Sequence, residues 1–369
     1  MGFSDFLGNE TAVRHLRESI AAGRLPHSLI LTGPRGAGKY TLALMLAQAA
    51  NCLDPKVTDG LPDFCGACRN CMRIAAASPL EERVAEAIAA REELRETDKK
   101  ETRILVQTHP DVLVIPPDPP QLLIKLGQVR HVIREMYRVP AEGRRAIYIF
   151  TSAAFMKEAA NSLLKVLEEP PDFASIFLLA ENPGELLPTI RSRSGMVRIG
   201  ALPLEQIEQM LAARHPDWPT ARRSLVARLA EGAVGRALAF DLEGYLASRV
   251  DALVILHNAI REPDYSALFR MTETYRAGAE GQERLVGLIR GVYSLLEDML
   301  LAQSGNENLL RNVDLAAEVT RMAGAVSLGW IEGAARGLVE LETGMRRNLL
   351  RSLALDSFAG QLAEQADRS

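Results

Sequence analysis

The first 200 residues alternate between short apolar runs and segments with helical spacing. Runs of four to eight apolar residues that are rich in branched side chains and bounded by turn-forming residues are typical of buried strands. Four such runs are SLILTG (28–33), DVLVI (111–115), AIYIF (146–150) and SIFLLA (175–180). Strands that alternate with helices predict a parallel sheet covered by crossover helices on both faces, which is an α/β fold.

The residues after Pro219 have a different pattern, because the remaining 150 residues contain a single proline, Pro263. Apolar residues recur there at steps of three and four, which places them on one face of a helix. The clearest series is Leu285, Leu288, Val292, Leu295 and Met299, and similar stretches cover 250–260 and 334–355. This part of the chain is therefore predicted to form a helical bundle.

A charged stretch at Glu81–Arg103 separates two of the predicted strands. It carries eight acidic and six basic residues. Mixed charge of this density is typical of a solvated surface helix, and we assign no chemistry to it.

Composition and charge exclude several classes of protein. The chain is 47% hydrophobic and 24% charged, which is ordinary for a globular protein, and its net charge of −4 gives no basic field that would attract nucleic acid. The longest apolar stretch, 42–53, is interrupted by Gln48 and Asn51 and is too short to span a bilayer. The first residues have no pattern of a secretory signal. We therefore expect a cytoplasmic protein with no membrane partner.

The segment 33–39 has the pattern of a phosphate-binding loop. It reads GPRGAGK and lies between the predicted strand SLILT and the helical run TLALMLAQAA. Gly33, Gly36 and Gly38 would let backbone N–H groups turn toward an anion, and Lys39 would reach the outer phosphates of ATP or ADP. An accidental glycine-rich turn is the alternative.

The residue after Lys39 departs from the pattern of active nucleotide hydrolases. That position normally carries the Ser or Thr that holds magnesium, and here it is Tyr40, with Thr41 one place later. One residue rotates a helical side chain by about 100°, so Thr41 is expected to point away from the metal unless the loop register shifts. The pattern therefore does not predict magnesium binding.

A longer set of motifs resembles the bacterial clamp-loader ATPase family. The most specific is KEAANSLLKVLEEPP (157–171). The others are RLPHSLILTGPRGAGK (24–39), THPDV (108–112), IRSRS (190–194) and GAVGRAL (232–238). They follow the order usual in the family and cover most of the first 240 residues.

The resemblance implies a fold and a set of partners. The fold is an AAA+ P-loop NTPase-type parallel sheet with an inserted zinc module, followed by a helical lid and an all-α C-terminal collar domain. The corresponding domains are 1–200, with the zinc module at about 50–75 and the charged insertion at about 79–103, then 201–245 and 246–369. The implied partners are gamma/tau and delta subunits in a five-membered ring, the sliding clamp, and primed DNA through the complex.

Active members of the family carry Asp-Glu at the end of the strand before the KEAANSLLK helix. In this chain those places fall on Phe150 and Thr151, neither of which has a carboxylate. Because phosphoryl transfer depends on metal and positioned charge, the resemblance implies a ring member without its own ATPase activity. The alternative is a gamma/tau-type motor that uses Thr41 and an unconventional acidic residue.

Three further residues correspond to nucleotide sensors of the family. The first sensor falls on Glu181 or Asn182, and the sequence does not distinguish them. Arg236, in GAVGRAL, matches the lid arginine that contacts nucleotide. A surface helix arginine is the alternative for Arg236.

Arg193 matches the arginine of the Ser-Arg-Cys motif of the family, with Ser194 in place of the cysteine. In the family this arginine reaches the ATP of the neighbouring subunit, where a guanidinium stabilises charge on the γ-phosphate. The resemblance therefore implies that Arg193 acts in trans as an arginine finger.

All four cysteines of the chain lie within 20 residues, at Cys52, Cys65, Cys68 and Cys71. Four closely spaced thiolates can complete a tetrahedral metal site with no open position, as in structural zinc sites. Disulfides are unfavourable in a reducing compartment, and an iron–sulfur cluster is the other alternative; the family resemblance points to zinc. A zinc-bearing adaptor that binds DNA directly is a further rival function, which the near-neutral charge disfavours.

Overall fold

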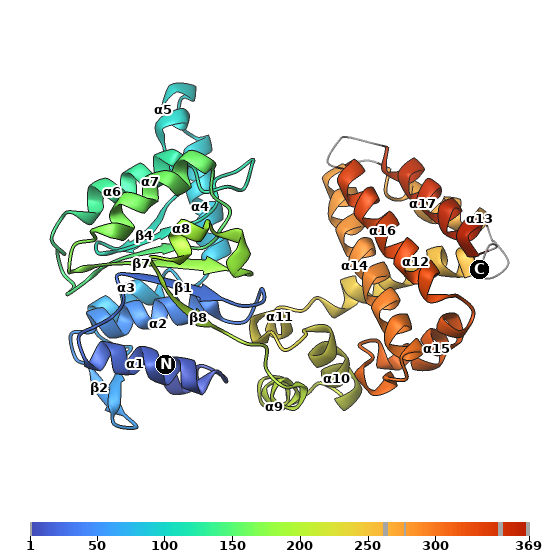
Figure 1. The fold of residues 1–369 in the computed structure, drawn as a ribbon, viewed down its shortest axis with the longest axis horizontal. Coiled ribbons are helices and arrows are strands. Elements are labelled where there is room, and N and C mark those ends of the chain that lie inside the picture. The colour runs from blue at the N-terminus through green and yellow to red at the C-terminus, as the bar shows by residue number, and fades with distance from the viewer. Residues whose placement is uncertain (1, 261–264, 277, 346–349, 367–369) are drawn as a thin grey trace. The chain divides into compact units, whose positions relative to one another are not determined.

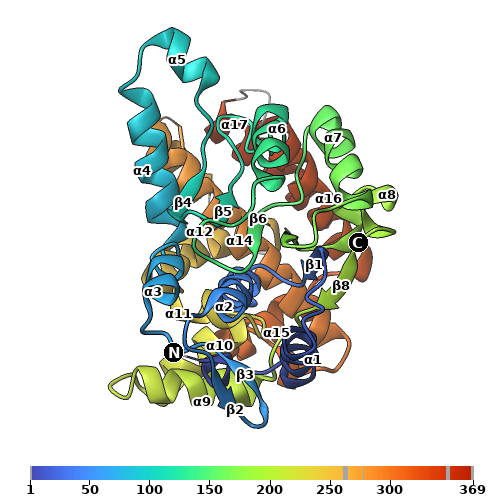
Figure 2. The same ribbon diagram turned by 90° about the vertical axis from the view of Figure 1, so that its left-hand side faces the viewer.

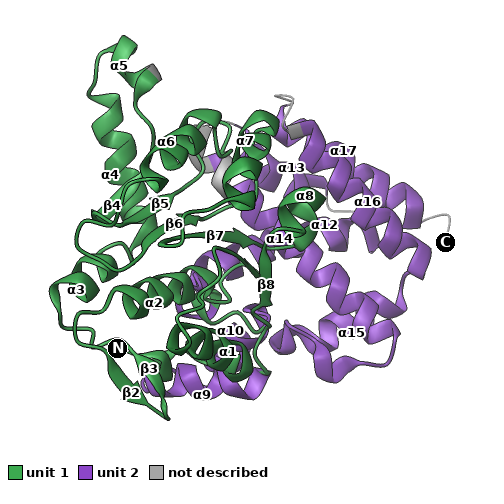
Figure 3. Ribbon diagram, turned by 60° about the vertical axis from the view of Figure 1, so that its left-hand side comes forward, with its two compact units in different colours: residues 1–203, 232–236 green, residues 204–231, 237–369 purple. Residues whose placement is uncertain are grey.

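The computed structural model describes residues 2–260, 265–276, 278–345 and 350–366. The chain forms two compact units (Figures 1 and 3). Unit 1 comprises Met1–Pro203 with Gly232–Arg236, and unit 2 comprises Leu204–Glu231 with Ala237–Ser369.

Unit 1 is built on a six-stranded sheet with the order β4-β5-β6-β7-β1-β8. Strands β5, β6, β7, β1 and β8 are parallel, and β4 is antiparallel to β5. The strands of this sheet are β1 (Ser28–Thr32), β4 (Val106–His109), β5 (Val112–Ile115), β6 (Ala146–Phe150), β7 (Ala174–Ala180) and β8 (Gly195–Arg198). The four apolar runs therefore form β1, β5, β6 and β7, which confirms the predicted α/β fold with a largely parallel sheet.

The strands bury alternate residues on opposite faces of the sheet. Leu29 and Leu31 pack with one set of helices, whereas Ile30 packs with the other. The first set is α1 (Glu10–Ala21), α2 (Lys39–Asn51) and α3 (Arg69–Ala75), and the second is α6 (Leu126–Met136), α7 (Lys157–Glu168) and α8 (Pro188–Arg191) (Figure 1). Two covered faces explain why the central strands are apolar without interruption.

Several short elements were not evident in the sequence. Strand β8 is largely exposed, and β4 is partly exposed, so neither has an apolar run. The hairpin of β2 (Lys56–Thr58) and β3 (Leu61–Asp63) lies between the first two cysteines. Short 3-10 helices are η1 (Phe3–Asp5) and η2 (Pro183–Glu185).

The charged stretch forms two helices rather than the single helix expected. They are α4 (Leu80–Glu92) and α5 (Glu96–Glu101), and α4 contains no buried residue. The break follows from the extended backbone of Arg95, which precedes α5. Both helices extend beyond the sheet (Figures 1 and 2), and Arg91 anchors α4 through a 2.7 Å ion pair with the buried Asp118.

Unit 2 is helical, as predicted. Its apolar core includes all five residues of the series from Leu285 to Met299, which lie buried on α14. The stretch 334–355 divides between two helices, and 346–349 lie outside the described residues. The helices are α9 (Leu204–Arg214), α10 (Thr220–Leu229), α11 (Val234–Leu238, shared with unit 1), α12 (Leu242–Ile260), α13 (Tyr265–Glu273), α14 (Gly278–Gln303), η3 (Glu307–Leu309), η4 (Val313–Leu315), α15 (Ala316–Gly324), α16 (Leu328–Met345) and α17 (Arg351–Ala366).

None of the helices in the described ranges combines the length and apolar character needed to cross a membrane.

Candidate functional site

The predicted phosphate loop joins the end of β1 to the start of α2. Gly33, Gly36 and Gly38 have φ values of +148°, +82° and +90°, a region that side-chain-bearing residues rarely adopt. A Cβ on Gly33 would lie 2.0 Å from the carbonyl oxygen of Ile199, which follows β8. The turn therefore requires all three glycines, and at Gly33 the close approach of Ile199 also leaves no room for a side chain.

Lys39 is the first residue of α2, and its ammonium group turns back into the loop. Its Nζ donates hydrogen bonds to the carbonyl oxygens of Gly33 (2.5 Å) and Pro34 (2.9 Å). Burial lowers the pKa of Lys39, and the carboxylates of Glu181 and Glu185 act in the opposite direction. The cation thus lies within the loop, with acidic groups nearby.

Arg236 lies beside the loop because α11 packs directly against Gly36. The backbone N–H of Gly235 donates to the carbonyl oxygen of Gly36 at 2.8 Å. A Cβ on Gly36 would lie 2.8 Å from the backbone nitrogen of Arg236. The structure therefore brings together two predicted nucleotide-binding residues that are 200 positions apart in sequence.

Tyr40 joins α2 to the residues that directly follow the cysteine-bearing segment (52–75). Its hydroxyl donates a 2.7 Å hydrogen bond to the carbonyl oxygen of Ala77, just beyond α3, and its ring packs on the core of this face. Burial raises the pKa of Tyr40, so the hydroxyl stays protonated as a donor. Thr41 is exposed on the next position of α2.

The end of β6 contains no acidic side chain. Phe150 is fully buried and packs against Phe155 with ring centroids 5.4 Å apart. The backbone N–H of Thr151 donates to the carbonyl oxygen of Ile115. Of the two positions where the family resemblance implies Asp-Glu, Phe150 is therefore part of the apolar core and Thr151 is half-buried.

The structure distinguishes the two residues that follow β7. The Asn182 side-chain oxygen accepts the N–H of Gly184 at 2.8 Å, and the Asn182 N–H donates to the Glu185 carboxylate at 3.0 Å. Asn182 thus caps the 3-10 helix η2. Of Glu181 and Asn182, it is Glu181 that influences Lys39, because its carboxylate raises the pKa of that lysine.

Arg193 lies at the opposite end of β1 from the phosphate loop. The turn 192–194 precedes β8, whose first residue, Gly195, pairs with Leu29. The Ser194 hydroxyl lies 2.6 Å from that of Ser28 at the start of β1. A five-residue strand is about 16 Å long, so Arg193 is separated from the loop of its own chain.

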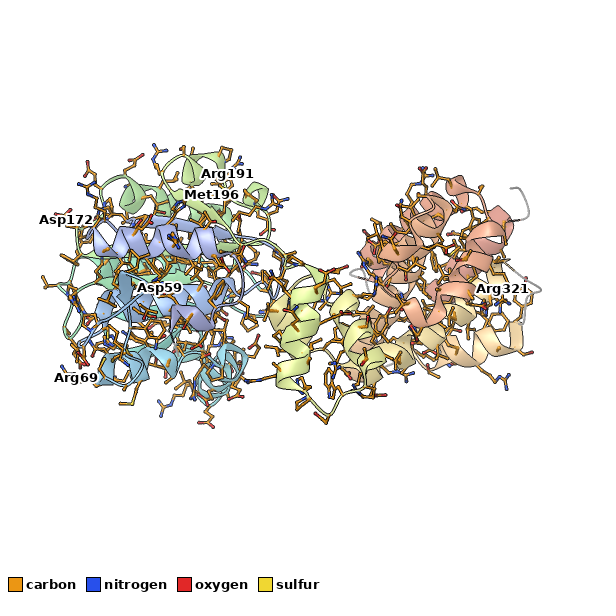
Figure 4. The ribbon with its side chains drawn as sticks, turned by 90° about the horizontal axis from the view of Figure 1, so that it is seen from below. Asp59, Arg69, Asp172, Arg191, Met196 and Arg321 are labelled. Atoms are coloured by element: carbon orange, nitrogen blue, oxygen red, sulfur yellow. The ribbon has the colours of Figure 1, made fainter. Side chains whose placement is uncertain are left out.

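The Arg193 turn lies at the surface of unit 1. Arg191 and Met196, on either side of the turn, lie at one edge of the unit, away from Arg69 of the cysteine-bearing segment (Figure 4). The Arg193 guanidinium contacts Glu168 at the end of α7, with Nη2 2.6 Å from Oε1.

The four cysteines converge on one point. Cys52 ends α2, Cys65 follows β3, Cys68 caps α3 and Cys71 lies within α3. Their Sγ atoms all lie within 4.8 Å of one another, and none of the four cysteines forms a disulfide. Backbone N–H groups of Cys65, Cys68 and Cys71 donate to the sulfurs of Cys52, Cys65 and Cys68, respectively.

The sulfur cluster fits a tetrahedral metal ion. Zinc–sulfur bonds of about 2.3 Å imply sulfurs about 3.8 Å apart, and the Sγ atoms of Cys65 and Cys71 are separated by 4.0 Å. Burial raises the pKa of Cys52 and Cys71. At Cys68 the effect of burial is outweighed by hydrogen bonds, chiefly from backbone groups of Cys71 and Leu53, which lower the pKa to about 6. These residues can hold a metal.

Two buried polar residues that support this region were not recognised from the sequence as structural. The Asn51 side-chain oxygen accepts the N–H groups of Arg144 and Arg145 at 2.8 and 2.9 Å. The Asp111 carboxylate accepts three N–H groups, from 141–143. The signal was available, because Asn51 interrupts an otherwise apolar helical run and Asp111 belongs to the THPDV motif.

The N-terminal segment also contributes to the loop region. A Cβ on Gly38 would lie 3.0 Å from the ring of Phe6. Asn9 exchanges hydrogen bonds with the backbone of Gly200, just after β8. No motif in the sequence marked these contacts.

A family model described as "DNA polymerase III, delta subunit" matches residues 8–86 and 80–203, which is more than half of the chain. The chain belongs to this family. The match confirms the resemblance to clamp-loader subunits of DNA polymerase III.

Curated relatives include two kinds of subunit. The chain is 29% identical to DNA polymerase III subunit tau of Escherichia coli over 241 residues, which is 64% of this chain and 32% of tau. It is 28% identical to subunit delta' of Bacillus subtilis over 312 residues, which is 84% of this chain and 82% of that protein. The chain thus spans about a third of the tau subunit and most of the delta' subunit.

Among solved structures, a gamma subunit-related protein of DNA polymerase III from Thermotoga maritima matches 96% of this chain and 99% of its own, at 18% identity and a TM-score of 0.39. That score is too low to bear on the fold.

Proposed function

We propose that this chain is a delta prime-type subunit of the DNA polymerase III clamp loader. In this proposal it is an AAA+ ring member that does not hydrolyse ATP and presents Arg193 to the nucleotide of a neighbouring subunit. Its partners are gamma/tau and delta subunits in a five-membered ring, the sliding clamp, and primed DNA through the complex. Residues 201–245 serve as the lid and 246–369 as the assembly collar.

The main support for the proposal is the identity of residue 40 and the hydrogen bond that its side chain makes. The position that would supply the magnesium-binding hydroxyl carries Tyr40, whose own hydroxyl donates a hydrogen bond to the carbonyl oxygen of Ala77. Without that ligand the loop lacks the means to place a metal between the β- and γ-phosphates.

Two further observations support the loss of hydrolysis. Phe150 and Thr151 supply no carboxylate to polarise water, and Phe150 is buried in the core. Glu181 adds negative charge next to Lys39, which disfavours a γ-phosphate at that position. ATP or ADP could still be held by the loop and Arg236 without turnover.

The position of Arg193 supports action in trans. It lies at the far end of β1 from the loop of its own chain, on the exposed turn before β8. A guanidinium brought to the neighbour's γ-phosphate would neutralise the charge that develops there in the transition state.

Zinc is the metal that we assign to the four cysteines. Four thiolates complete the coordination of a structural zinc ion and leave no position for a reacting water. Bound zinc would hold the ends of α2 and α3 and the β2–β3 hairpin together, with no catalytic part.

The experiment that tests the proposal uses the reconstituted complex with variants of this chain. Arg193→Ala should leave ring assembly intact and lower ATP turnover by about 10-fold or more, as expected for loss of an arginine finger. Arg198→Ala, an exposed arginine at the end of β8, is the matched control and should keep full turnover. Unchanged turnover in Arg193→Ala would exclude the finger.

A gamma/tau-type motor is the second candidate, because the identity to E. coli tau is as high as that to delta'. The alignment with delta' extends further along this chain, over 84% against 64%. The two candidates differ in whether the isolated chain hydrolyses ATP.

A further inference from the structure

We infer that Glu168 is a positioning residue for Arg193. Its carboxylate holds the guanidinium in one orientation before the neighbouring subunit's nucleotide arrives. The inference rests on the proposed function, and it adds a residue that the family motif Ser-Arg-Cys does not include.

The contacts of Arg193 involve all three nitrogens of the guanidinium. Nε donates to Glu168 Oε1 at 2.9 Å, and Nη2 lies 2.6 Å from the same oxygen. Nη1 donates to the carbonyl oxygen of Thr189 at 3.1 Å and to the Ser192 hydroxyl at 3.3 Å. A planar group contacted through every nitrogen has little freedom to rotate.

These contacts still leave donor capacity for an outside ligand. A guanidinium carries five N–H groups, two of them on Nη2. One Glu168 oxygen can accept at most one of the two from Nη2, so the other stays available. The side chains of Arg193 and Glu168 are 36% and 51% exposed, so a group outside the chain can reach them.

Both residues stand on elements that are fixed by packing. Glu168 is the last residue of α7, and Pro170 and Pro171 follow just beyond it. Leu167 of α7 and Ile190 of α8 are buried in the same apolar cluster. The carboxylate and the arginine turn are therefore held at a defined separation.

The local charge explains why this position favours an arginine partner. Glu168 and Glu169 lie at the C-terminal end of α7, where the helix dipole is negative and carboxylates are unfavourable. The contact with Arg193 offsets that repulsion at Glu168. Glu169 is exposed and makes no ion pair among the described residues, so it provides a matched control.

Removal of the Glu168 carboxylate should act on catalysis rather than on folding. An exposed ion pair adds little to stability. Without Glu168, Arg193 keeps only its Nη1 contacts, so its guanidinium must be ordered again each time it meets the nucleotide. The cost of ordering one such side chain corresponds to a loss of about 2-fold to 10-fold in turnover. The KM for ATP should stay constant if the arginine acts in the transition state.

The test is steady-state ATP turnover by the reconstituted complex. The variants are Glu168→Ala, Glu168→Gln, Glu169→Ala, Arg193→Ala and the double variant Glu168→Ala with Arg193→Ala. We expect Glu168→Ala to lower kcat, Glu168→Gln to recover part of the loss because it keeps an acceptor oxygen, and Glu169→Ala to match the parent. The double variant should be no slower than Arg193→Ala alone, since Glu168 acts only through Arg193.

Two results would overturn the inference while the proposed function stands. One is a decrease in Arg193→Ala with unchanged or faster turnover in Glu168→Ala. The other is an equal effect of Glu168→Ala with and without Arg193. If Arg193→Ala itself has no effect, the proposed function fails, and the inference fails with it.

Discussion

Single residues decide the chemistry of the phosphate loop. The glycines adopt the positive φ values of the turn and Lys39 lies within it, whereas Tyr40 and Phe150 stand where the family resemblance implies metal-binding groups. Phe150 is buried in one apolar cluster of unit 1, and the partly buried Tyr40 packs against the other. Under the proposed function, placing a metal-binding side chain at either position would therefore also remove packing contacts in unit 1.

The contact between Gly36 and α11 leads to the first prediction at this scale. Gly36→Ala would place a Cβ 2.8 Å from the Arg236 backbone nitrogen at a φ of +82°. We expect it to destabilise the protein by about 2–3 kcal/mol, from left-handed strain and overpacking together. Urea unfolding measures the effect.

Gly60→Ala separates the two causes in that experiment. Gly60 has a similar φ of +74°, but a Cβ at this position would meet no atom within 4 Å. The substitution should cost about 1 kcal/mol, from backbone strain alone. Equal losses of unfolding free energy in the two variants would show that contact between the loop and α11 adds nothing to the effect of Gly36→Ala.

Asn51 provides a second residue-scale prediction. Asn51→Ala would leave the partly buried N–H groups of Arg144 and Arg145 without their acceptor. A fully buried group left unsatisfied costs about 1–3 kcal/mol, so for two partly buried groups together we expect a loss of about 1–3 kcal/mol in the free energy of unfolding. Asn161→Ala, at an exposed position of α7, is the control and should change stability by less than about 0.5 kcal/mol.

At the scale of elements, the sequence predicts the parts whose signal is local. The strands β1, β5, β6 and β7 are uniformly buried, so their apolar runs identify them. Strand β8 is a short, largely exposed edge strand with the sequence GMVR, and it forms through pairing with β1. Its register depends on contacts that no local pattern contains.

The residues of the candidate site likewise divide into those with a local sequence signal and those without one. The loop glycines, Lys39 and the four cysteines have characteristic spacing and could be found from the sequence. The contact of Gly235 with Gly36 and the contact of Glu168 with Arg193 join residues far apart in the chain. Such pairs depend on how α11 and α7 pack, which spacing alone does not determine.

The cysteine-bearing segment 52–75 carries the element-scale prediction. The purified chain should contain one zinc per molecule, and Cys68→Ser should lose it, because three thiolates and a hydroxyl hold zinc less well than four thiolates. Proteolysis should then cut within the segment while the sheet keeps its circular dichroism signal. Met72→Ser, an exposed position on α3, is the control and should retain the metal.

Two measurements could contradict the zinc assignment: elemental analysis and proteolysis of metal-free protein. Elemental analysis that finds no metal, or finds iron, would exclude a structural zinc site. A fully protected segment in metal-free protein would show that the hairpin and α3 fold without it.

At the scale of the whole molecule, the loop and the arginine lie at opposite ends of one strand. β1 begins beside Ser194 and ends at Thr32, just before Gly33, so the phosphate loop and the turn that carries Arg193 are held apart by the length of that strand. A subunit built in this way can serve a neighbour's nucleotide whether or not it turns over its own. This separation of roles is the central claim of the proposed function.

Steady-state ATP hydrolysis by the isolated chain tests that claim most directly. The measurement compares the parent with Lys39→Ala, with and without magnesium, primed DNA and the sliding clamp. We expect no turnover in the parent above the level of Lys39→Ala under any of these conditions. Clear turnover that requires magnesium and disappears in Lys39→Ala would contradict the account and identify the chain as a motor subunit.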